Sequence, residues 1–396
     1  MKFDPYDPKL HEDPYPVYQE LRDSHPAYYN PDMDFWALSR YDDVDNALKN
    51  PDLFISSEGV TVGIDKGGDL QKAVPLLIMM DGVDHTRLRS LVSGSFAPRR
   101  LKSLESAIDS IARSLAKELE AEAEPDLVYH FSNPLPTIVI AELLGVPSED
   151  REQFKEWSNA ITQFDPTKPQ GAHPGGESGP AVELAAYLSA VIEDRRKNPA
   201  NDLLSQLVTT EIDGRSLTGP ELLGFGFLLL VAGHETATNL ISNAAILLDQ
   251  HPDQRKKLIE DPSLLPLAVE EFLRFDSPVQ GLARTTTEDV SLHGEVIPKG
   301  SSVLLLFASA NRDERHFSNP AEFDITRSPN AHLAFGFGKH FCLGSGLARM
   351  EGRIAFEVLL ERFPKYSLKN PEVERVRSGP IRGAVSLPVD LGDIRG

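Results

Sequence analysis

The sequence predicts a mainly α-helical fold with a minor β component, in one domain over residues 1–396. Apolar residues recur at helical spacing in several long segments, whereas short alternating stretches lie only near the two ends of the chain. With 40% hydrophobic residues in a chain of 396, there is enough apolar material for a substantial core. We therefore expect a helix-rich part joined to a small β-rich part.

The first half of the chain contains a strand followed by helices. Residues 33–41, MDFWALSRY, alternate and carry aromatic side chains, which predicts a strand. Helical spacing predicts amphipathic helices over 101–123, 150–163 and 180–197. The Pro- and Gly-rich stretch 165–180 cannot continue a helix. It is either a surface connector or a lid over a cavity, and its composition does not distinguish the two.

The longest predicted helix begins near residue 218 and ends near Gln250. Thr218 and Glu221 have the spacing of a capping box, and Pro220 lies in the first turn, where its missing N–H is not needed. Such a helix is roughly 45 Å long, the width of a domain. It is apolar nearly all round from Phe225 to Ala232, so we expect its middle to be buried.

The last third of the chain returns to short strands and ends with one more helix. Residues 289–308 predict strands around turns at His293–Gly294 and Lys299–Gly300. Apolar residues from Leu343 to Val358 then recur at helical spacing, which predicts a helix that begins directly after the only cysteine.

Charge and cysteine content exclude several classes of protein. A formal net charge of −20 argues against electrostatic capture of nucleic acid or of an anionic membrane. A single cysteine excludes an intramolecular disulfide framework and any multi-cysteine zinc or iron–sulfur site. The first 18 residues contain no apolar signal core, and the longest apolar run, 227–232, is too short to span a bilayer. We expect a soluble cytoplasmic protein.

Cys342 lies in FGFGKHFCLG, residues 335–344, and could be a buried small side chain, a nucleophile or a metal ligand. Its glycines are costly to order unless the backbone needs positive φ or close approach to a flat group. The helix that follows favours a thiolate at its N-terminus, and thiolate is the form that a metal ligand requires. His340, two residues away on an extended loop, is poorly placed to act as a base for a nucleophile. The loop therefore favours metal ligation.

Polar residues interrupt the apolar part of the long helix at Gly233, His234, Glu235 and Thr236. One interpretation is a local kink in which Thr236 bonds back to a carbonyl four residues earlier. The other is functional: a small residue admits a large group, and an acid beside a hydroxyl relays protons. This segment alone does not separate the two.

Together these stretches resemble the cytochrome P450 family. FGFGKHFCLG is similar to its haem-binding loop, AGHET at 232–236 to its oxygen-activating motif, and DHTRLRSLV at 84–92 to a haem-contacting helix. EEFLRF contains the family's Glu-x-x-Arg pair as Glu271 and Arg274. The four motifs occur in the family's order, and the resemblance covers essentially the whole chain.

The resemblance implies a cytochrome P450-like fold with haem between the long central helix and the cysteine loop. Cys342 would be the iron ligand, and Thr236 and Glu235 the catalytic proton-relay pair. Glu271 and Arg274 would be structural, with Arg327 as their third partner. The remaining cofactor-binding residues that it implies are His85, Arg89, Arg284 and His340 as partners of the haem propionates, and Phe335, Gly336, Ala232 and Gly233 close to the porphyrin.

The implied activity is that of a haem-thiolate monooxygenase. It would hydroxylate, O-dealkylate or epoxidise a small to medium apolar molecule, using haem b (iron protoporphyrin IX), O2 and two electrons from NAD(P)H. The acid–alcohol pair favours O2 over direct use of peroxide. The electrons would come through a reductase and a separate ferredoxin or flavodoxin that docks on the proximal, cysteine side of a monomer, where basic residues could form a patch: Arg99, Arg100, Lys102, Lys339, Arg349 and Arg353.

The predicted substrate pocket is mostly aliphatic. Counting helical turns back from Thr236 places three residues toward one cavity, and the resemblance adds others: Leu228, Val231 and Ala232, then Val279, Gln280, Leu282, Ile381 and the loop 60–77. Arg382 is expected to serve structure. A terpenoid, steroid-like or aromatic substrate fits these side chains.

Two other classes of function stay open at this point. A haem-binding sensor or carrier would need haem but no proton relay, which the Glu235–Thr236 pair argues against. A cysteine-dependent hydrolase would need no haem at all.

Overall fold

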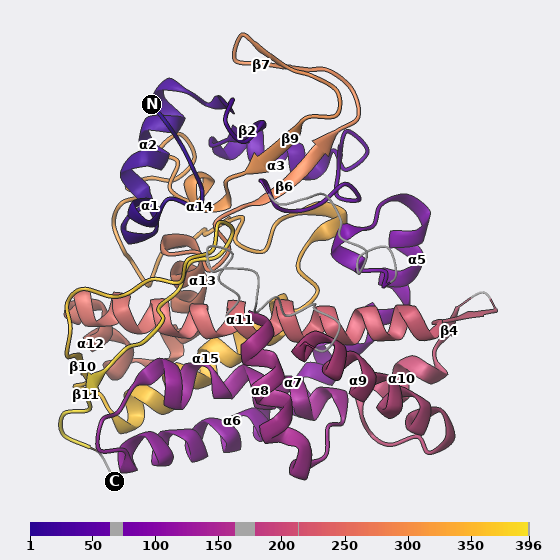
Figure 1. Ribbon diagram of the computed structural model, residues 1–396. Coiled ribbons are helices and arrows are strands. Elements are labelled where there is room, and N and C mark those ends of the chain that lie inside the picture. The colour runs from indigo at the N-terminus through magenta and orange to yellow at the C-terminus, as the bar shows by residue number, and fades with distance from the viewer. Residues whose placement is uncertain (64–73, 163–178, 213, 395–396) are drawn as a thin grey trace.

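The computed structural model describes residues 1–63, 74–162, 179–212 and 214–394. Its helices form the larger part of the molecule, and α11 crosses that part from side to side (Figure 1). The main helices are α5 (Gly82–Ser93), α6 (Pro98–Ala121), α7 (Pro134–Leu144), α8 (Arg151–Thr162), α9 (Pro180–Lys197), α10 (Leu203–Thr209), α11 (Gly219–Gln250), α12 (Pro252–Glu260), α13 (Leu265–Phe275) and α15 (Ser345–Arg362). The shorter ones are α1 (Pro8–Glu12), α2 (Tyr15–Ser24), α3 (Tyr41–Lys49) and α14 (Phe307–Ala310).

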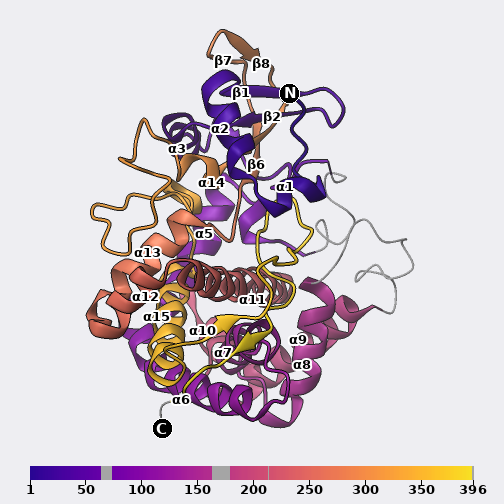
Figure 2. The same cartoon turned by 90° about the vertical axis from the view of Figure 1, so that its left-hand side faces the viewer.

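The β part is small, and its largest sheet lies at one side of the helical part, together with α1 to α3 (Figure 2). Its largest sheet has the strand order β1-β2-β9-β6-β3. These strands are β1 (Ala27–Asn30), β2 (Phe35–Leu38), β9 (Ser302–Leu305), β6 (Leu282–Thr286) and β3 (Phe54–Ile55). The two-stranded sheets are β7 (Val290–Leu292) with β8 (Glu295–Ile297), β4 (Glu211–Ile212) with β5 (Arg215–Ser216), and β10 (Ser367–Leu368) with β11 (Val389–Asp390).

The predicted fold class, mainly α-helical with a minor β component, is confirmed. Several elements also begin or turn where local sequence signals predicted. Thr218 and Glu221 form the predicted capping box at the start of α11, and the helix runs to Gln250. His293 and Gly294 have φ of 53° and 85° in the β7–β8 turn, where the sequence predicted one. Residues 33–41 contain β2, as predicted. Of the stretch predicted as connector or lid, 165–178 lies outside the described residues.

One prediction about α11 is wrong. Its middle was expected to be buried all round, but Leu228 and Val231 are partly exposed and Ala232 is exposed. The neighbours Leu222, Phe225 and Leu230 are buried. One side of the central helix therefore faces an open space instead of packed side chains.

The described residues form three hydrophobic clusters. The largest joins α6, α7, α11, α13 and α15, a second surrounds β2, β9 and α3, and a third packs the N-terminal segment against the sheet. β2 pairs with β9 in parallel and β6 with β9 in antiparallel orientation, with Ala37 and Ala283 both opposite Leu304. This pairing sets the position of β6, whose Arg284 belongs to the predicted site. Within the described residues, no helix combines the length and apolar character needed to cross a bilayer.

Candidate functional site

The cysteine loop has a backbone that needs glycine at two positions. Gly336 and Gly338 have φ of 66° and 70°, as the sequence predicted. A Cβ on Gly338 would also lie 2.8 Å from the carbonyl oxygen of Leu48 in α3, so the loop and α3 are in close backbone contact. The Cys342 N–H donates to the Phe335 carbonyl at 2.9 Å and closes the loop. Gly344, by contrast, has φ of −83° and is not required for its conformation.

The ionisation of Cys342 differs from the expectation drawn from its helix. Burial raises the pKa of this thiol above its usual value, although the N–H groups of Gly344 and Ser345 and the cation of Arg89 act in the opposite direction. The N–H groups at the helix N-terminus therefore favour the thiolate, as the sequence predicted, but burial acts more strongly in the opposite direction. A bound metal cation is what would stabilise the thiolate at this position.

Basic side chains gather beside the cysteine loop. The rings of His85 and His340 lie 4.3 Å apart between centroids, and Arg284 is 4% exposed. Burial, together with the neighbouring Arg284 and His85, lowers the pKa of His340 to about 4. Burial also lowers the pKa of Arg284 to about 10. Arg89 donates from Nη2 to the Phe341 carbonyl at 2.5 Å.

This cluster is suited to an anionic group. Nε2 of His85 is buried and has no hydrogen-bond partner among the described residues. One carboxylate, Asp81, lies 3.4 Å from Nε2 of His340, but its Oδ2 accepts from the backbone N–H groups of Ser56 and Ser57. Arg284, His85 and His340 therefore share one carboxylate, and one buried ring nitrogen among them is unsatisfied within the described residues. The four predicted propionate partners are close to the cysteine loop, and they fit a group with two carboxylates.

The predicted acid–alcohol pair lies on the open side of α11. Leu228, Ala232 and Thr236 are four residues apart and share one face of the helix. Oγ1 of Thr236 donates to the Ala232 carbonyl at 2.6 Å, which is the back-bonding that the kink interpretation predicted. Burial raises the pKa of Glu235 to about 7, so its carboxyl holds a proton at a far higher pH than an ordinary glutamate.

Gly233 has a different neighbour from the one predicted. A Cβ at this position would lie 3.0 Å from Cδ1 of Ile140 in α7. The glycine therefore permits close packing of α7 on α11, and the predicted approach of a large group at Gly233 is replaced by this contact. Ala232, which is exposed, has the position that the cofactor-binding prediction requires.

The Glu-x-x-Arg pair is buried and fully hydrogen-bonded. Arg274 donates to both carboxylate oxygens of Glu271, from Nε at 2.8 Å and from Nη2 at 2.7 Å, and both side chains are 0% exposed. Nε of Arg327 lies 3.3 Å from Oε2 of Glu271, so the predicted third partner is confirmed. Asn330, which sequence reasoning did not identify, also donates to Glu271 at 3.0 Å. These contacts tie α13 to the segment that leads into the cysteine loop.

Acidic residues neutralise part of the predicted basic patch. Arg349, whose guanidinium lies 4.6 Å from the ring centroid of Phe335, donates to Glu270 and helps to lower the pKa of that glutamate to about 2. Arg353 pairs with Glu105, and Lys339 lies 3.5 Å from Asp52. Arg99 and Lys102 are exposed. The neighbouring Leu101 touches the start of α15 at Gly346, which brings these two cations near the loop.

The predicted substrate residues divide into two groups. Val279 and Leu282 are partly exposed, and Val279 pairs with Ile381 in an isolated antiparallel bridge. Gln280 is instead occupied: its Oε1 accepts from the Tyr18 hydroxyl at 3.1 Å, and its Nε2 donates to the Ser277 carbonyl at 2.6 Å. We therefore leave Gln280 out of the substrate pocket. Of the loop 60–77, residues 64–73 lie outside the described part.

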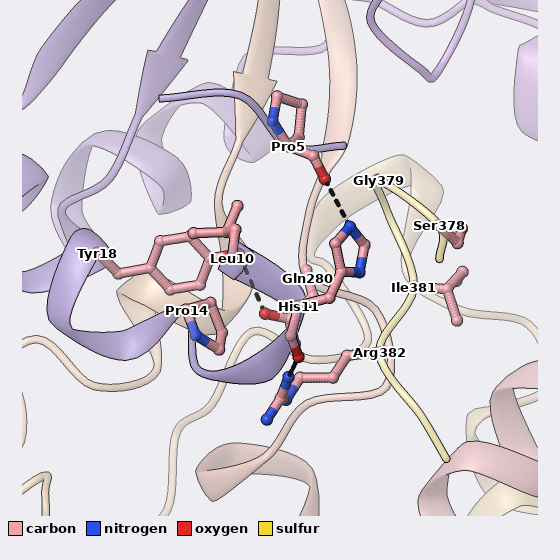
Figure 3. A pocket seen from close by; sticks show the side chains of 10 residues that line it. All are labelled: Pro5, Leu10, His11, Pro14, Tyr18, Gln280, Ser378, Gly379, Ile381 and Arg382. Carbon is pink, nitrogen blue, oxygen red and sulfur yellow. Dashed lines mark hydrogen bonds between the residues drawn. The ribbon is translucent and has the colours of Figure 1, made fainter. Parts of the chain in front are cut away.

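Figure 3 shows that Gln280 and Ile381 line a small cavity together with residues from α1, α2 and the C-terminal segment. Its volume is about 10 Å³, room for one water at most. Arg382 lies at its edge and donates from Nε to Asp276 at 2.8 Å, which confirms its predicted structural role. This cavity is too small for an organic substrate.

The comparisons with known proteins agree with this geometry. The family model "Cytochrome P450" matches residues 11–388. The chain is 42% identical to a vitamin D(3) 25-hydroxylase of Pseudonocardia autotrophica, over 96% of this chain and 94% of that one. It is 39% identical to putative cytochrome P450 123 of Mycobacterium tuberculosis, over 99% and 97%. The crystal structure of CYP109E1 from Bacillus megaterium with corticosterone is 35% identical, covers 97% of this chain and 100% of that one, and has a TM-score of 0.89.

Proposed function

The chain belongs to the cytochrome P450 family of haem-iron monooxygenases, and from this premise we propose that it oxidises a steroid-like apolar molecule by hydroxylation, O-dealkylation or epoxidation. The observation that carries the proposal is the open face of α11, where the exposed Ala232 lies one turn from Thr236 and the partly exposed Leu228 lies one turn before Ala232. An apolar substrate and a proton source meet on that face.

In this proposal the cofactor is haem b, held by residues of three separate segments. Cys342 is the iron ligand, and Gly336 lets the loop lie close to the porphyrin. Arg89 and His85 from α5, Arg284 from β6 and His340 from the loop bind the two propionates, since these groups lack enough anionic partners of their own. When bound, haem with a thiolate ligand supplies the chemistry that cleaves O2 and inserts one oxygen atom into the substrate.

The protein's own part in the reaction is proton delivery on the open face of α11. Glu235, with a pKa of about 7, exists in both forms near neutral pH and can accept a proton from water and release it again. The Thr236 hydroxyl is held by the Ala232 carbonyl at 2.6 Å, so its oxygen has a fixed position on the helix. Thr236 and Glu235 are therefore the proposed proton-relay pair.

The substrate class follows from the side chains on this face and from the relatives. Leu228, Val231 and Ala232 from α11 and Val279, Leu282 and Ile381 from the β part supply apolar contacts, which suit a rigid hydrocarbon skeleton. One relative is named for 25-hydroxylation of vitamin D(3), and one neighbour was crystallised with corticosterone. These names support a steroid-like substrate over a benzoate or a fatty acid.

Electrons from NAD(P)H are proposed to arrive through a separate ferredoxin or flavodoxin. The exposed Phe337 and Phe341 of the cysteine loop, with Arg99 and Lys102 of α6, offer apolar and cationic contacts on the same side. The predicted docking surface is narrower than the six-residue patch, because Arg349, Arg353 and Lys339 are paired with carboxylates. The monomeric state and the cytoplasmic location stay predictions.

A spectrum and one substitution test the proposed function. The reduced, carbon-monoxide-bound protein should show the red-shifted absorption band of thiolate-ligated haem, and its absence would contradict the cofactor proposal. Steroids should shift the haem iron from low to high spin in a titration that also includes terpenoids, fatty acids and benzoates. Thr236→Ala should lower product formation by about tenfold or more and divert electrons into peroxide. Normal coupling in that variant would favour a different relay.

A further inference from the structure

His234 is a buried polar residue of α11 for which the proposed function has no use. It is 1% exposed and precedes Glu235 in the chain. Successive residues of a helix are rotated by about 100°, so His234 points to nearly the opposite side of α11 from Thr236, two residues on. There its Nδ1 lies 2.7 Å from Oγ of Ser158, a residue of α8 that is 0% exposed. The back of the relay turn is thus joined to another helix.

The imidazole is neutral and has few polar contacts. Burial lowers the pKa of His234 to about 4, so the ring carries no charge near neutral pH. Its Nε2 is buried and has no hydrogen-bond partner within the described residues. The Ser158 hydroxyl is therefore the polar contact that fixes the ring, and a hydrogen bond of 2.7 Å tolerates little change in distance or angle.

The turn that carries the relay is weaker than an ordinary helical turn. Gly233 lowers helix propensity, and two threonine hydroxyls compete for carbonyls of the same turn: Thr236 donates to Ala232 and Thr238 to His234. Such a turn is held in place by its side-chain contacts more than by its own backbone. In this turn, the hydrogen bond of His234 fixes a direction. The apolar contact of Gly233 with Ile140 does not depend on direction.

Helix α8 is tied to α9 as well as to α11. Nε1 of Trp157 donates to Glu183 of α9 at 2.8 Å, and Phe154 of α8 is buried. In α9, Leu188 packs on α11 at Gly226 through methyl groups, again without direction. A shift of the α8–α9 pair would therefore reach the relay turn chiefly through the bond between Ser158 and His234.

We propose that the Ser158–His234 hydrogen bond is a positioning contact that transmits the placement of α8 to the Glu235–Thr236 relay. This inference rests on the proposed function and adds the regulation of its relay. Neither residue takes part in the chemistry; they keep the carboxyl and the hydroxyl at the right place on the open face. When the bond is lost, reduction continues but protons arrive late, and electrons leave as peroxide.

The test measures coupling in the haem-loaded protein, with a surrogate ferredoxin and reductase and with the steroid that gives the largest spin shift. Ser158→Ala and His234→Leu should each raise peroxide per NAD(P)H by roughly threefold or more, with the carbon-monoxide spectrum unchanged. His234→Asn keeps a polar atom near the position of Nδ1 and should restore much of the coupling. The double variant should be no worse than either single one, since both remove the same contact.

Ser132→Ala is the matched control, because it removes a buried hydroxyl that has no hydrogen-bond partner among the described residues, from the short π-helix Val128–Ser132. It should leave coupling unchanged. If Thr236→Ala uncouples the enzyme but Ser158→Ala and His234→Leu do not, the inference is overturned while the proposed function stands. Additive effects in the double variant, or no recovery with Asn, would likewise contradict it. If Thr236→Ala has no effect, it is the proposed function that fails.

Discussion

At the scale of single residues, Glu235 has the clearest consequence for activity. Its pKa of about 7 lies well above that of an ordinary glutamate because the carboxyl is taken out of water. A relay delivers protons from the protonated carboxyl, which predominates below pH 7. We predict that product formation at saturating substrate falls as pH rises through about 7, and that Glu235→Gln lowers the rate and removes this dependence.

The measurement is a pH profile of product formed per NAD(P)H consumed, from pH 6 to 9. Glu235→Asp is the matched control: it keeps an acid at this position, so its product formation should still fall as pH rises. If product formation by Glu235→Gln falls with pH in the same way as that of the native protein, another group causes the pH dependence.

Glu351 of α15 is a second buried acid, and its effect is on stability. It is 2% exposed, its Oε1 has no hydrogen-bond partner in the described residues, and burial raises its pKa to about 8. In the unfolded chain this carboxyl ionises near pH 4.5, whereas in the folded protein it stays protonated up to about pH 8. Below pH 4.5 it is protonated in both states and does not destabilise the fold; as pH rises from 4.5 toward 8, the free energy of unfolding decreases. We predict that Glu351→Gln is more stable than the native protein at pH 8 by roughly 1–3 kcal/mol and equal to it near pH 4.5.

Urea unfolding of the haem-loaded protein at several pH values measures this difference. Glu357→Gln on the same helix serves as a control, because its carboxylate is half-exposed and paired with Arg353. An equal response of the two variants to pH would show that burial of Glu351 is not the cause.

At the scale of elements, the pair Glu271–Arg274 joins α13 to the segment before the cysteine loop. Arg274 also donates to the carbonyls of Asn311 and Pro320, so its guanidinium is almost fully used. Glu271→Ala would leave that cation buried without its partner, and we predict a loss of about 3–5 kcal/mol together with loss of bound haem. Unfolding midpoints and haem content per chain measure both. Arg327→Met, which removes the outer partner, should cost less; an equal loss would mean that Arg327 is the essential cation.

Element boundaries were predictable where the signal is local. Thr218 and Glu221 placed the start of α11 because a capping box is complete within four residues. Helical turns counted back from Thr236 predicted that Ala232 faces a cavity, but periodicity does not show whether an apolar residue faces a cofactor or a core. The same limit applies to Gly233, whose packing against Ile140 depends on a helix some ninety residues away.

More of the site residues were identified from sequence motifs than from single residues considered alone. Cys342, His85, Arg89, Arg284 and His340 come from three segments, and the structure places the four basic side chains beside the cysteine loop. The link from His234 to Ser158 was not predictable, because nothing in residues 150–163 marks one serine as the partner of a histidine 76 positions later. For Cys342, the sequence shows the helix that favours a thiolate but not the depth of burial that opposes it.

At the scale of the whole molecule, a buried cluster around Asp276 joins the two ends of the chain. Asp276 follows α13, is 5% exposed, and accepts from Arg382 at 2.8 Å and from the Tyr15 hydroxyl at 2.6 Å. Arg382 also donates to the carbonyls of His11 and Glu12. The guanidinium of Arg312 stacks on Tyr15, with 3.5 Å to the ring centroid. The N-terminal helices and the C-terminal segment therefore share one carboxylate.

This cluster gives the last prediction. The neighbouring cations Arg382 and Arg375 lower the pKa of Asp276 despite its burial, so its contribution to stability is present above the unfolded pKa and is lost as pH falls through the lower, folded value. Asp276→Asn keeps the shape but leaves these arginines without a counter-charge. We predict a loss of about 3–5 kcal/mol at pH 7, and faster proteolysis near both termini than in the helical part.

Chemical unfolding and limited proteolysis with mass analysis of the fragments measure these two effects. Asp393→Asn is the control, because it removes an exposed carboxylate that pairs with Lys365 near the C-terminus and should change neither. If Asp276→Asn unfolds at the native midpoint, the arginines are held by their carbonyl contacts alone. If stability falls but cleavage is spread over the whole chain, the cluster supports the fold in general and does not specifically fasten its two ends.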